Sequence, residues 1–275
     1  MAGESYANAD ALVSADWLAQ HLDDPRVRVV EIDVSPKSYG EGHIAGAVFW
    51  DIYADLKDRR YRLVDGPAFE RIVRASGIAP DTTVVCYGYG AVFGYWLLRL
   101  YRHPHVAVLN AAKTRWHDEG RPESVERPTV PPTTYALPAP DGELRATQAM
   151  VAAAIGAPES ALLDVRSDAE FRGERFWPSG APAENGRAGH IPGAVHIVPD
   201  AFITADGSFA SPAALRAVFP AALDGAANLV TYCTIGNRAS VAWFVLTELL
   251  GRRGVRVYDG SWAEWGFMPD TQVAT

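Results

Sequence analysis

The organisation of this chain follows from one stretch in its C-terminal half, Asn228-Leu229-Val230-Thr231-Tyr232-Cys233-Thr234-Ile235-Gly236-Asn237-Arg238-Ala239-Ser240. The apolar residues at its start predict a buried strand that stops at Cys233. Small and polar residues follow, and the mainly apolar segment 241–250 then predicts a helix. Cys233 is therefore expected in a turn between a strand and a helix, just ahead of the helix N-terminus.

This position predicts that Cys233 is a reactive thiolate. The unpaired N–H groups and the dipole of a helix N-terminus favour negative charge, which helps a nearby cysteine to ionise. Gly236 allows the loop to curl, and Arg238 brings a positive charge five positions after the sulfur. The alternative is an inert cysteine buried at a strand end, the commoner state of a lone cysteine, but the loop chemistry favours the reactive one. The residues expected to cradle an anion here are Thr234, Ile235, Gly236, Asn237, Arg238 and Ala239.

The composition narrows the class of protein. Of the 275 residues, 48% are hydrophobic and 21% charged, which is typical of a globular protein. The net charge of −8 argues against nucleic acid or an anionic membrane as a partner. Two cysteines, Cys86 and Cys233, cannot form a disulfide-dense framework, and no His/Cys cluster has zinc spacing. Because the chain also lacks a membrane-length apolar run, and residues 1–5 lack a signal pattern, we expect a cytoplasmic protein without metal or cofactor.

The chain is a duplication of one α/β unit. The segment Gly42-His43-Ile44-Ala45-Gly46-Ala47-Val48 returns almost unchanged as Gly189-His190-Ile191-Pro192-Gly193-Ala194-Val195. In each copy, expected strands alternate with expected helices, which predicts a mostly parallel sheet flanked by helices on both faces. Six prolines between residues 122 and 141 predict an extended linker. We therefore expect an N-terminal half over 1–121, a linker over 122–143 and a C-terminal half over 144–275.

The two copies differ at the cysteine loop. Aligning Tyr87 with Tyr232 places Gly88 opposite Cys233, so the first copy lacks a nucleophile. A second alignment, of Trp96 with Trp243, would instead place Cys86 opposite Cys233. The first alignment is preferred because it keeps both strands in phase. It predicts that the N-terminal half is inactive, packs on the C-terminal half and walls one side of a pocket between them.

Other polar residues of the repeat are expected to be structural. His43 and His190 occur in both copies, one of which lacks the cysteine, so they are expected to pin the turn rather than to catalyse. Asp164 and Arg166 flank a strand end and are expected to pair. Of three arginines between that strand and the turn, Arg172 is ranked first as a residue reaching the pocket, on sequence position alone.

Taken together, these motifs resemble those of the two-domain rhodaneses, the thiosulfate sulfurtransferases. The resemblance rests on the series Asp-Val-Arg, Gly-His-Ile-Pro-Gly-Ala, Tyr-Cys-x-x-Gly-x-Arg and Tyr-Asp-Gly-Ser-Trp, spread from about residue 13 to 266. It implies tandem rhodanese domains, of which the second is catalytic. It also implies that Cys233 carries a sulfane sulfur as a persulfide, taken from thiosulfate and passed to cyanide or a thiol. The chain departs from the family at Asn110-Ala111-Ala112, usually Asp-Gly-Gly, and at Glu170, which is arginine in some members.

Three alternatives stay open. A 3-mercaptopyruvate sulfurtransferase typically has a Cys-Gly-x-Gly loop without arginine, so Thr234 and Arg238 favour thiosulfate. A cysteine phosphatase needs five residues between its cysteine and arginine, whereas four separate Cys233 from Arg238. A non-catalytic sulfur carrier would hold the persulfide without turning over.

Overall fold

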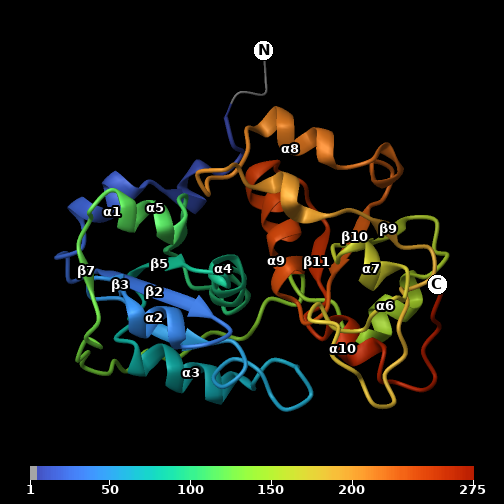
Figure 1. Ribbon diagram of the computed structural model, residues 1–275, viewed down its shortest axis with the longest axis horizontal. Helices are drawn as coiled ribbons and strands as arrows, with labels where there is room; N and C mark the ends of the chain where they lie inside the picture. The colour runs from blue at the N-terminus through green and yellow to red at the C-terminus, as the bar shows by residue number, and fades with distance from the viewer. Residues whose placement is uncertain (1–4) are drawn as a thin grey trace.

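Two parallel β-sheets, one from each half of the chain, form the framework of the computed structural model (Figure 1). The structure describes residues 5–275, so most of the segment 1–5, which lacks a signal pattern, lies outside the described residues. The strand order is β1-β6-β5-β2-β4 in the first sheet and β11-β10-β8-β9 in the second, and every pairing in both is parallel. The expected α/β architecture is confirmed.

The first sheet and its helices come from residues 12–118. The strands are β1 (Leu12–Val13), β2 (Val27–Asp33), β4 (Val48–Asp51), β5 (Thr83–Tyr87) and β6 (Val106–Leu109). The helices are α1 (Ala15–Gln20), α2 (Lys37–Glu41), α3 (Gly66–Ala75), α4 (Ala91–Leu100) and α5 (Lys113–Asp118), preceded by a 3₁₀ turn, η1 (Ala9–Ala11). The short strands β3 (His43–Ile44) and β7 (Glu123–Ser124) form a separate antiparallel pair.

The second sheet repeats this arrangement with fewer strands. Its strands are β8 (Ser160–Asp164), β9 (Val195–His196), β10 (Asn228–Tyr232) and β11 (Val255–Val257). Its helices are α6 (Gln148–Ala154), α7 (Asp168–Phe171), α8 (Pro212–Val218), α9 (Asn237–Phe244) and α10 (Ser261–Trp265). Two 3₁₀ turns, η2 (Pro199–Phe202) and η3 (Ala221–Leu223), and a π-helical turn, η4 (Val245–Leu249), complete it.

Alternation along the strands places a core on each face of the first sheet. On β5, Cys86 belongs to the core beneath α3 and α4, whereas Val85 and Tyr87 belong to the core with α1 and α5. Successive strand side chains point to opposite faces, so a strand covered on both sides is apolar throughout. Cys86 is thus a small buried hydrophobe, as predicted, and burial raises the pKa of its thiol.

Matching hydrogen bonds identify equivalent residues in the two halves. The Ile44 N–H donates to the Tyr87 hydroxyl at 3.0 Å, and the Ile191 N–H donates to the Tyr232 hydroxyl at 3.1 Å. Tyr87 and Tyr232 therefore occupy the same place in the repeat, and the preferred alignment is confirmed. Gly88, opposite Cys233, has a φ of +93°, and a Cβ there would lie 2.8 Å from the Ile32 carbonyl oxygen. No cysteine fits that position without a shift of the backbone.

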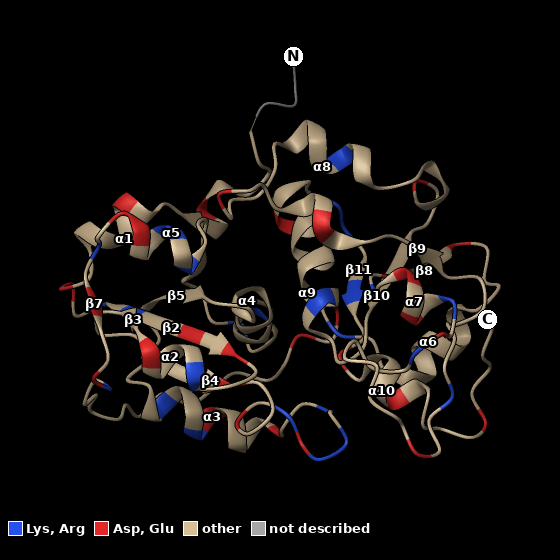
Figure 2. Cartoon of the chain, viewed as in Figure 1, with Lys and Arg blue, Asp and Glu red and all other residues tan. Residues whose placement is uncertain are grey.

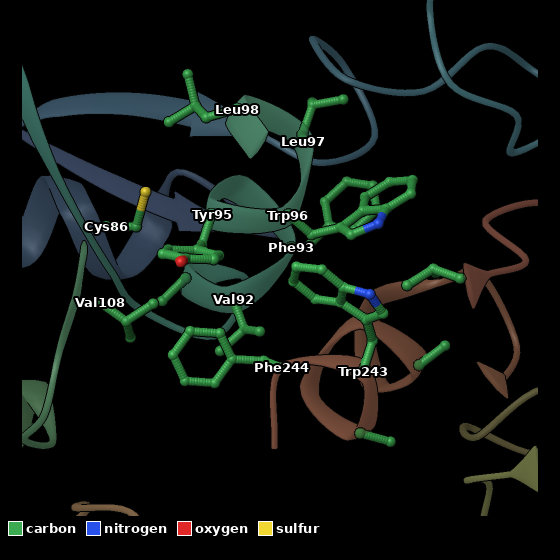
Figure 3. Close-up of a cluster of buried hydrophobic side chains, with 14 of the residues drawn as sticks. Cys86, Val92, Phe93, Tyr95, Trp96, Leu97, Leu98, Val108, Trp243 and Phe244 are labelled. Carbon is green, nitrogen blue, oxygen red and sulfur yellow. The ribbon is translucent and has the colours of Figure 1, made fainter. Parts of the chain in front are cut away.

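The two halves meet along the equivalent helices α4 and α9. Almost every residue of α4 is buried, and the Tyr95 ring packs edge-on against Phe244 with centroids 4.9 Å apart. Figure 3 shows Tyr95, Phe244 and Trp243 gathered at this contact, with Cys86 behind α4 on the side away from α9. The apolar contact between α4 and α9 fixes the position of the N-terminal half beside the loop that holds Cys233.

The proline-rich segment is extended but lies against the N-terminal half. Thr133 donates its N–H to the Arg74 carbonyl at 3.0 Å, and Asp141 donates its N–H to the Leu100 carbonyl at 2.7 Å. These bonds tie the segment to the ends of α3 and α4. The predicted linker is thus part of the packed structure over much of its length.

Two predicted helices begin one turn earlier than expected. The helix after the cysteine begins at Asn237 instead of residue 241, so Arg238 and Ala239 belong to its first turn, and it passes into a π-helical turn at Val245. Helix α3 begins at Gly66 instead of residue 70, because Asp65 caps the Ala68 N–H and Pro67 suits the first turn. The first turn of α9 is mainly polar and α3 opens with Gly66-Pro67, so neither first turn carries an apolar pattern of helical spacing, which explains both errors.

Candidate active site

Cys233 lies directly after β10, and α9 begins four residues later at Asn237. The tight connection depends on Gly236, which caps α9 with a φ of +93°. A Cβ at this position would lie 2.8 Å from the Asp259 carbonyl oxygen, so conformation and space both require glycine. In the N-terminal half the corresponding loop from Gly88 to the helix cap Gly90 is one residue shorter.

The sulfur of Cys233 is almost enclosed, with the residue 1% exposed. Its Sγ accepts a hydrogen bond from the Gly236 N–H at 3.2 Å, and its own N–H donates to the Ser261 Oγ at 3.1 Å. The N–H groups of Asn237, Arg238 and Ala239 open α9 and have no partner within the helix. The sulfur therefore sits where the backbone favours negative charge.

Glu170 organises the far side of the loop. Its side chain is fully buried and accepts two parallel hydrogen bonds of 2.9 Å from the Arg238 guanidinium. The Thr234 hydroxyl donates to Glu170 and accepts from Arg238. Burial alone would raise the pKa of Glu170, but the bonds and charge of Arg238, with the hydroxyls of Thr234 and Ser167, lower it to about 2. Glu170 is therefore a carboxylate that neutralises Arg238.

This pair changes the part expected of Arg238. The sequence indicated a free cation that would hold an anion, but the guanidinium is committed to Glu170 and its side chain is only 21% exposed. The sequence marks Glu170 only as a departure from the family. The signal that locates it is the capping box at the start of α7, in which Ser167 and Glu170 bond reciprocally.

Arg172 lies away from this site. Its side chain is 61% exposed and pairs with Glu174 at 2.9 Å. It does not line the cavity at Cys233. Sequence position alone ranked it, and the structure gives it no contact with the cysteine loop.

A cavity of about 60 Å³ opens at Cys233 and receives residues from both halves. Tyr53 and Tyr89 come from the N-terminal half, and the Asn237 side chain donates to the Tyr89 carbonyl at 3.4 Å. Trp177 and Pro178 close another side. The volume is far below the roughly 300–1,000 Å³ of sites for larger organic ligands, so the cavity suits a small ion or the end of a longer molecule.

Trp177 and Pro178 belong to an insertion that the first half lacks. His43 contacts the carbonyl of a residue four positions earlier, Tyr39, whereas His190 makes the same contact nineteen positions back, with Phe171. Each histidine ring also stacks on that partner's ring. Both histidines are structural, as predicted. The longer segment between Phe171 and His190 is what carries Trp177 to the cavity.

A buried ion pair and a buried lysine form part of the frame of the site. Asp164 and Arg166 form a fully buried pair, as expected, and the Arg166 guanidinium lies 4.5 Å from the Trp262 ring centre. Lys57, from the N-terminal half, is buried and donates to the Asp259 carbonyl oxygen at 2.9 Å. Burial lowers the pKa of Lys57 to about 8. That carbonyl is the one against which Gly236 packs, so Lys57 supports the cysteine loop from behind.

Within residues 5–275 no group of three His, Cys, Asp or Glu side chains could hold a metal ion, and no helix there is long and apolar enough to cross a membrane.

The geometry can be compared with known proteins. A family model for the rhodanese-like domain matches residues 14–119 and again residues 147–267. The chain belongs to the rhodanese family. It is 41% identical over 267 residues to a Mycolicibacterium smegmatis protein named "Putative thiosulfate sulfurtransferase", covering 94% of this chain and 96% of that one. It is 39% identical over 279 residues to the "Sulfur carrier protein TtuD" of Thermus thermophilus, covering 98% of both.

A solved structure with the rhodanese fold superposes on nearly the whole chain. SseA from Escherichia coli, described as a 3-mercaptopyruvate sulfotransferase, superposes with a TM-score of 0.79 at 25% identity, covering 92% of this chain and 98% of that one. This rhodanese is accordingly a sulfurtransferase with tandem domains.

Proposed function

We propose that this rhodanese takes the sulfane sulfur of thiosulfate onto Cys233 and passes it to cyanide or a thiol. The observation that carries the proposal is the placement of Cys233. Its Sγ receives a backbone N–H at the start of α9, inside a cavity of about 60 Å³ that admits only a small group. Covalent catalysis by an activated thiolate needs this combination of nucleophile, access and charge stabilisation.

In the first half-reaction, the Cys233 thiolate attacks the outer sulfur of thiosulfate. A bond forms between Sγ and that sulfur, the S–S bond of thiosulfate breaks, and its electron pair leaves with sulfite. The persulfide keeps the negative charge, and the N–H groups at the start of α9 stabilise it. In the second half-reaction, cyanide or a thiolate attacks the outer sulfur, and Cys233 leaves as the thiolate.

Arg238 acts in this scheme mainly through the loop. Because Glu170 neutralises the guanidinium and Thr234 bonds to both, the three side chains hold the loop in the shape that presents Gly236 to the sulfur. The attraction for the donor then comes chiefly from the helix N-terminus.

The direct test is thiocyanate formation from thiosulfate and cyanide, with Cys233→Ser beside Cys86→Ser as the matched control. We expect the first variant to be inactive and the second to keep most activity. Mass spectrometry after thiosulfate alone should show one added sulfur atom on the peptide containing Cys233. Wild-type protein that forms neither thiocyanate nor the adduct would refute the proposal.

The similarity to the sulfur carrier TtuD supports a second candidate, a carrier that holds the persulfide for a protein acceptor. The two differ in turnover. A carrier releases one sulfite per cysteine and stops, whereas the proposed enzyme releases many when cyanide is present. The similarity to SseA makes 3-mercaptopyruvate the donor to compare with thiosulfate in the same assay.

A further inference from the structure

A second cavity, of about 560 Å³, adjoins the cavity at Cys233. It lies between the loop that follows β4 and the segment around the end of α10, and its lining includes Arg59, Arg60, Trp177 and Phe267. Trp177 lines both cavities, so it forms the boundary between them. At the floor, the Ala263 N–H donates to the Thr234 carbonyl at 2.8 Å, which links this cavity to the cysteine loop.

The N-terminal side of the second cavity is positively charged. Arg59, Arg60 and Arg62 all line it, and Figure 2 shows their loop in blue at the lower centre of the molecule. Arg62 pairs with Asp58 at 2.9 Å, whereas Arg59 and Arg60 are exposed and pair with no carboxylate among residues 5–275. In a chain with a net charge of −8, this local excess of arginine selects for an anionic ligand.

The opposite side is apolar and aromatic except for one acidic residue, Glu264, against the three arginines of the loop. The Trp177 ring lies 5.2 Å from Tyr61 and 6.2 Å from Phe267, measured between ring centres. Phe267 is 40% exposed and Met268 is 37% exposed, so two large apolar side chains beside the site face solvent. A ligand that fits must combine negative groups with an apolar chain.

We propose that this second cavity binds the sulfur acceptor, a low-molecular-weight thiol that carries at least two carboxylates. The inference rests on the proposed function, whose persulfide is the sulfur source. The volume of 560 Å³ falls in the range of about 300–1,000 Å³ usual for small organic ligands, whereas 60 Å³ admits only the thiol end. The carboxylates meet Arg59 and Arg60, the chain lies on Phe267 and Met268, and the thiol passes Trp177.

The transfer balances without a further reactant. The acceptor thiolate attacks the outer sulfur of the Cys233 persulfide and forms a new S–S bond. The bond between that sulfur and the Cys233 Sγ breaks, and its electron pair stays on the Cys233 thiolate. The product is the acceptor persulfide, which carries the negative charge away.

The test compares two acceptors of the same skeleton, glutathione with two carboxylates and its diethyl ester with none. In the double variant Arg59→Gln/Arg60→Gln, we expect kcat/KM for glutathione to fall about tenfold, and kcat/KM for the ester, cyanide and thiosulfate to stay within twofold. The matched control is Arg71→Gln/Arg216→Gln, which removes two exposed arginines that line neither cavity. We expect it to leave all four values unchanged.

The outcomes separate the two proposals. A selective loss for glutathione supports the acceptor site. Equal changes for glutathione and its ester, or the same loss in the control variant, overturn the acceptor site while thiocyanate formation still upholds the proposed function. Wild-type protein that makes no thiocyanate overturns the proposed function itself.

Discussion

Replacing Arg238 with methionine would leave the Glu170 carboxylate buried without its cation. Glu170 is 0% exposed and now accepts two hydrogen bonds of 2.9 Å from Arg238. Its remaining partners would be the hydroxyls of Thr234 and Ser167 and the Ser167 N–H. Methionine keeps a long apolar stem, so the change removes charge with little change in volume. The variant therefore measures what the buried pair contributes to stability.

Two independent estimates of the free energy of unfolding lost in Arg238→Met agree. Removing one partner of a buried ion pair costs about 3–5 kcal/mol, and the lower end applies because the Arg238 side chain is 21% exposed. A pKa of about 2 in place of 4.5 corresponds to about 3 kcal/mol of preference for the charged form of Glu170. For a chain of this size, a loss of about 3 kcal/mol lowers Tm by about 5–10 °C.

Urea unfolding at pH 7 gives the free energy directly, and a cycle with Glu170→Gln isolates the pair. We expect Glu170→Gln to cost less than Arg238→Met, because the guanidinium can reach water, and the double variant to recover much of the loss. The native pKa of Glu170 lies below its unfolded value, so its stabilisation is present above pH 4.5 and is lost as the pH falls toward 2. The gap between wild type and Arg238→Met should therefore narrow at pH 4. A urea midpoint equal to that of the wild type, or a double variant as unstable as Arg238→Met, would refute the reasoning.

Three further predictions concern the loop and its support. Cys233→Ser should abolish thiocyanate formation while Cys86→Ser keeps most of it, because Cys86 is buried behind α4; a reversed result would contradict the alignment of the two halves. One glycine inserted after Gly236 should sharply lower thiosulfate transfer and let phosphate or tungstate inhibit weakly, since the loop then has phosphatase spacing; wild-type hydrolysis of an aryl phosphate that disappears in Cys233→Ser would argue for phosphatase chemistry instead. The native pKa of Lys57, about 8, lies below its ordinary 10.5, so its burial penalty applies fully below pH 8 and fades as the pH rises to 10.5. Relative to Lys57→Met, the wild type should gain up to about 3 kcal/mol between these pH values, and urea midpoints at pH 7.5 and 9.5 that differ by the same amount in both proteins would rule this out.

The sequence predicted the parts of this molecule that depend on local apolar patterns. Strand β2 begins and ends where the pattern placed it, at Val27 and Asp33, and the strand before Cys233 ends at Tyr232. The duplication supplied the rest of the architecture, because two copies of one pattern require two copies of one fold. The sequence did not predict the short helices α2, α7 and α8, because four to seven residues of mixed polarity carry too little periodicity to indicate a helix.

The missing features of the site depend on contacts between distant residues. Glu170 and Arg238 lie 68 positions apart, and nothing local to either shows that they pair. Trp177 reaches the cavity through an irregular, proline- and glycine-rich segment, whose path no periodic pattern describes. Arg172, by contrast, is close in sequence to residues that matter and points to solvent. Proximity along the chain was a poor guide to proximity in space.

The contact between α4 and α9 makes each half of the chain depend on the other. Because Tyr53 and Tyr89 line the cavity of the other half, and Tyr95 packs against Phe244, the site depends on the shape of the first half, although that half has Gly88 where the second has Cys233. A change on its α4 surface would reach the cysteine loop across the contact. Its own loop from Gly88 to Gly90 is held there too, because the Tyr89 carbonyl accepts a hydrogen bond from the Asn237 side chain. Expressing the two halves as separate chains would therefore expose the aromatic residues that α4 and α9 bury against each other, and we expect neither half alone to form the complete site.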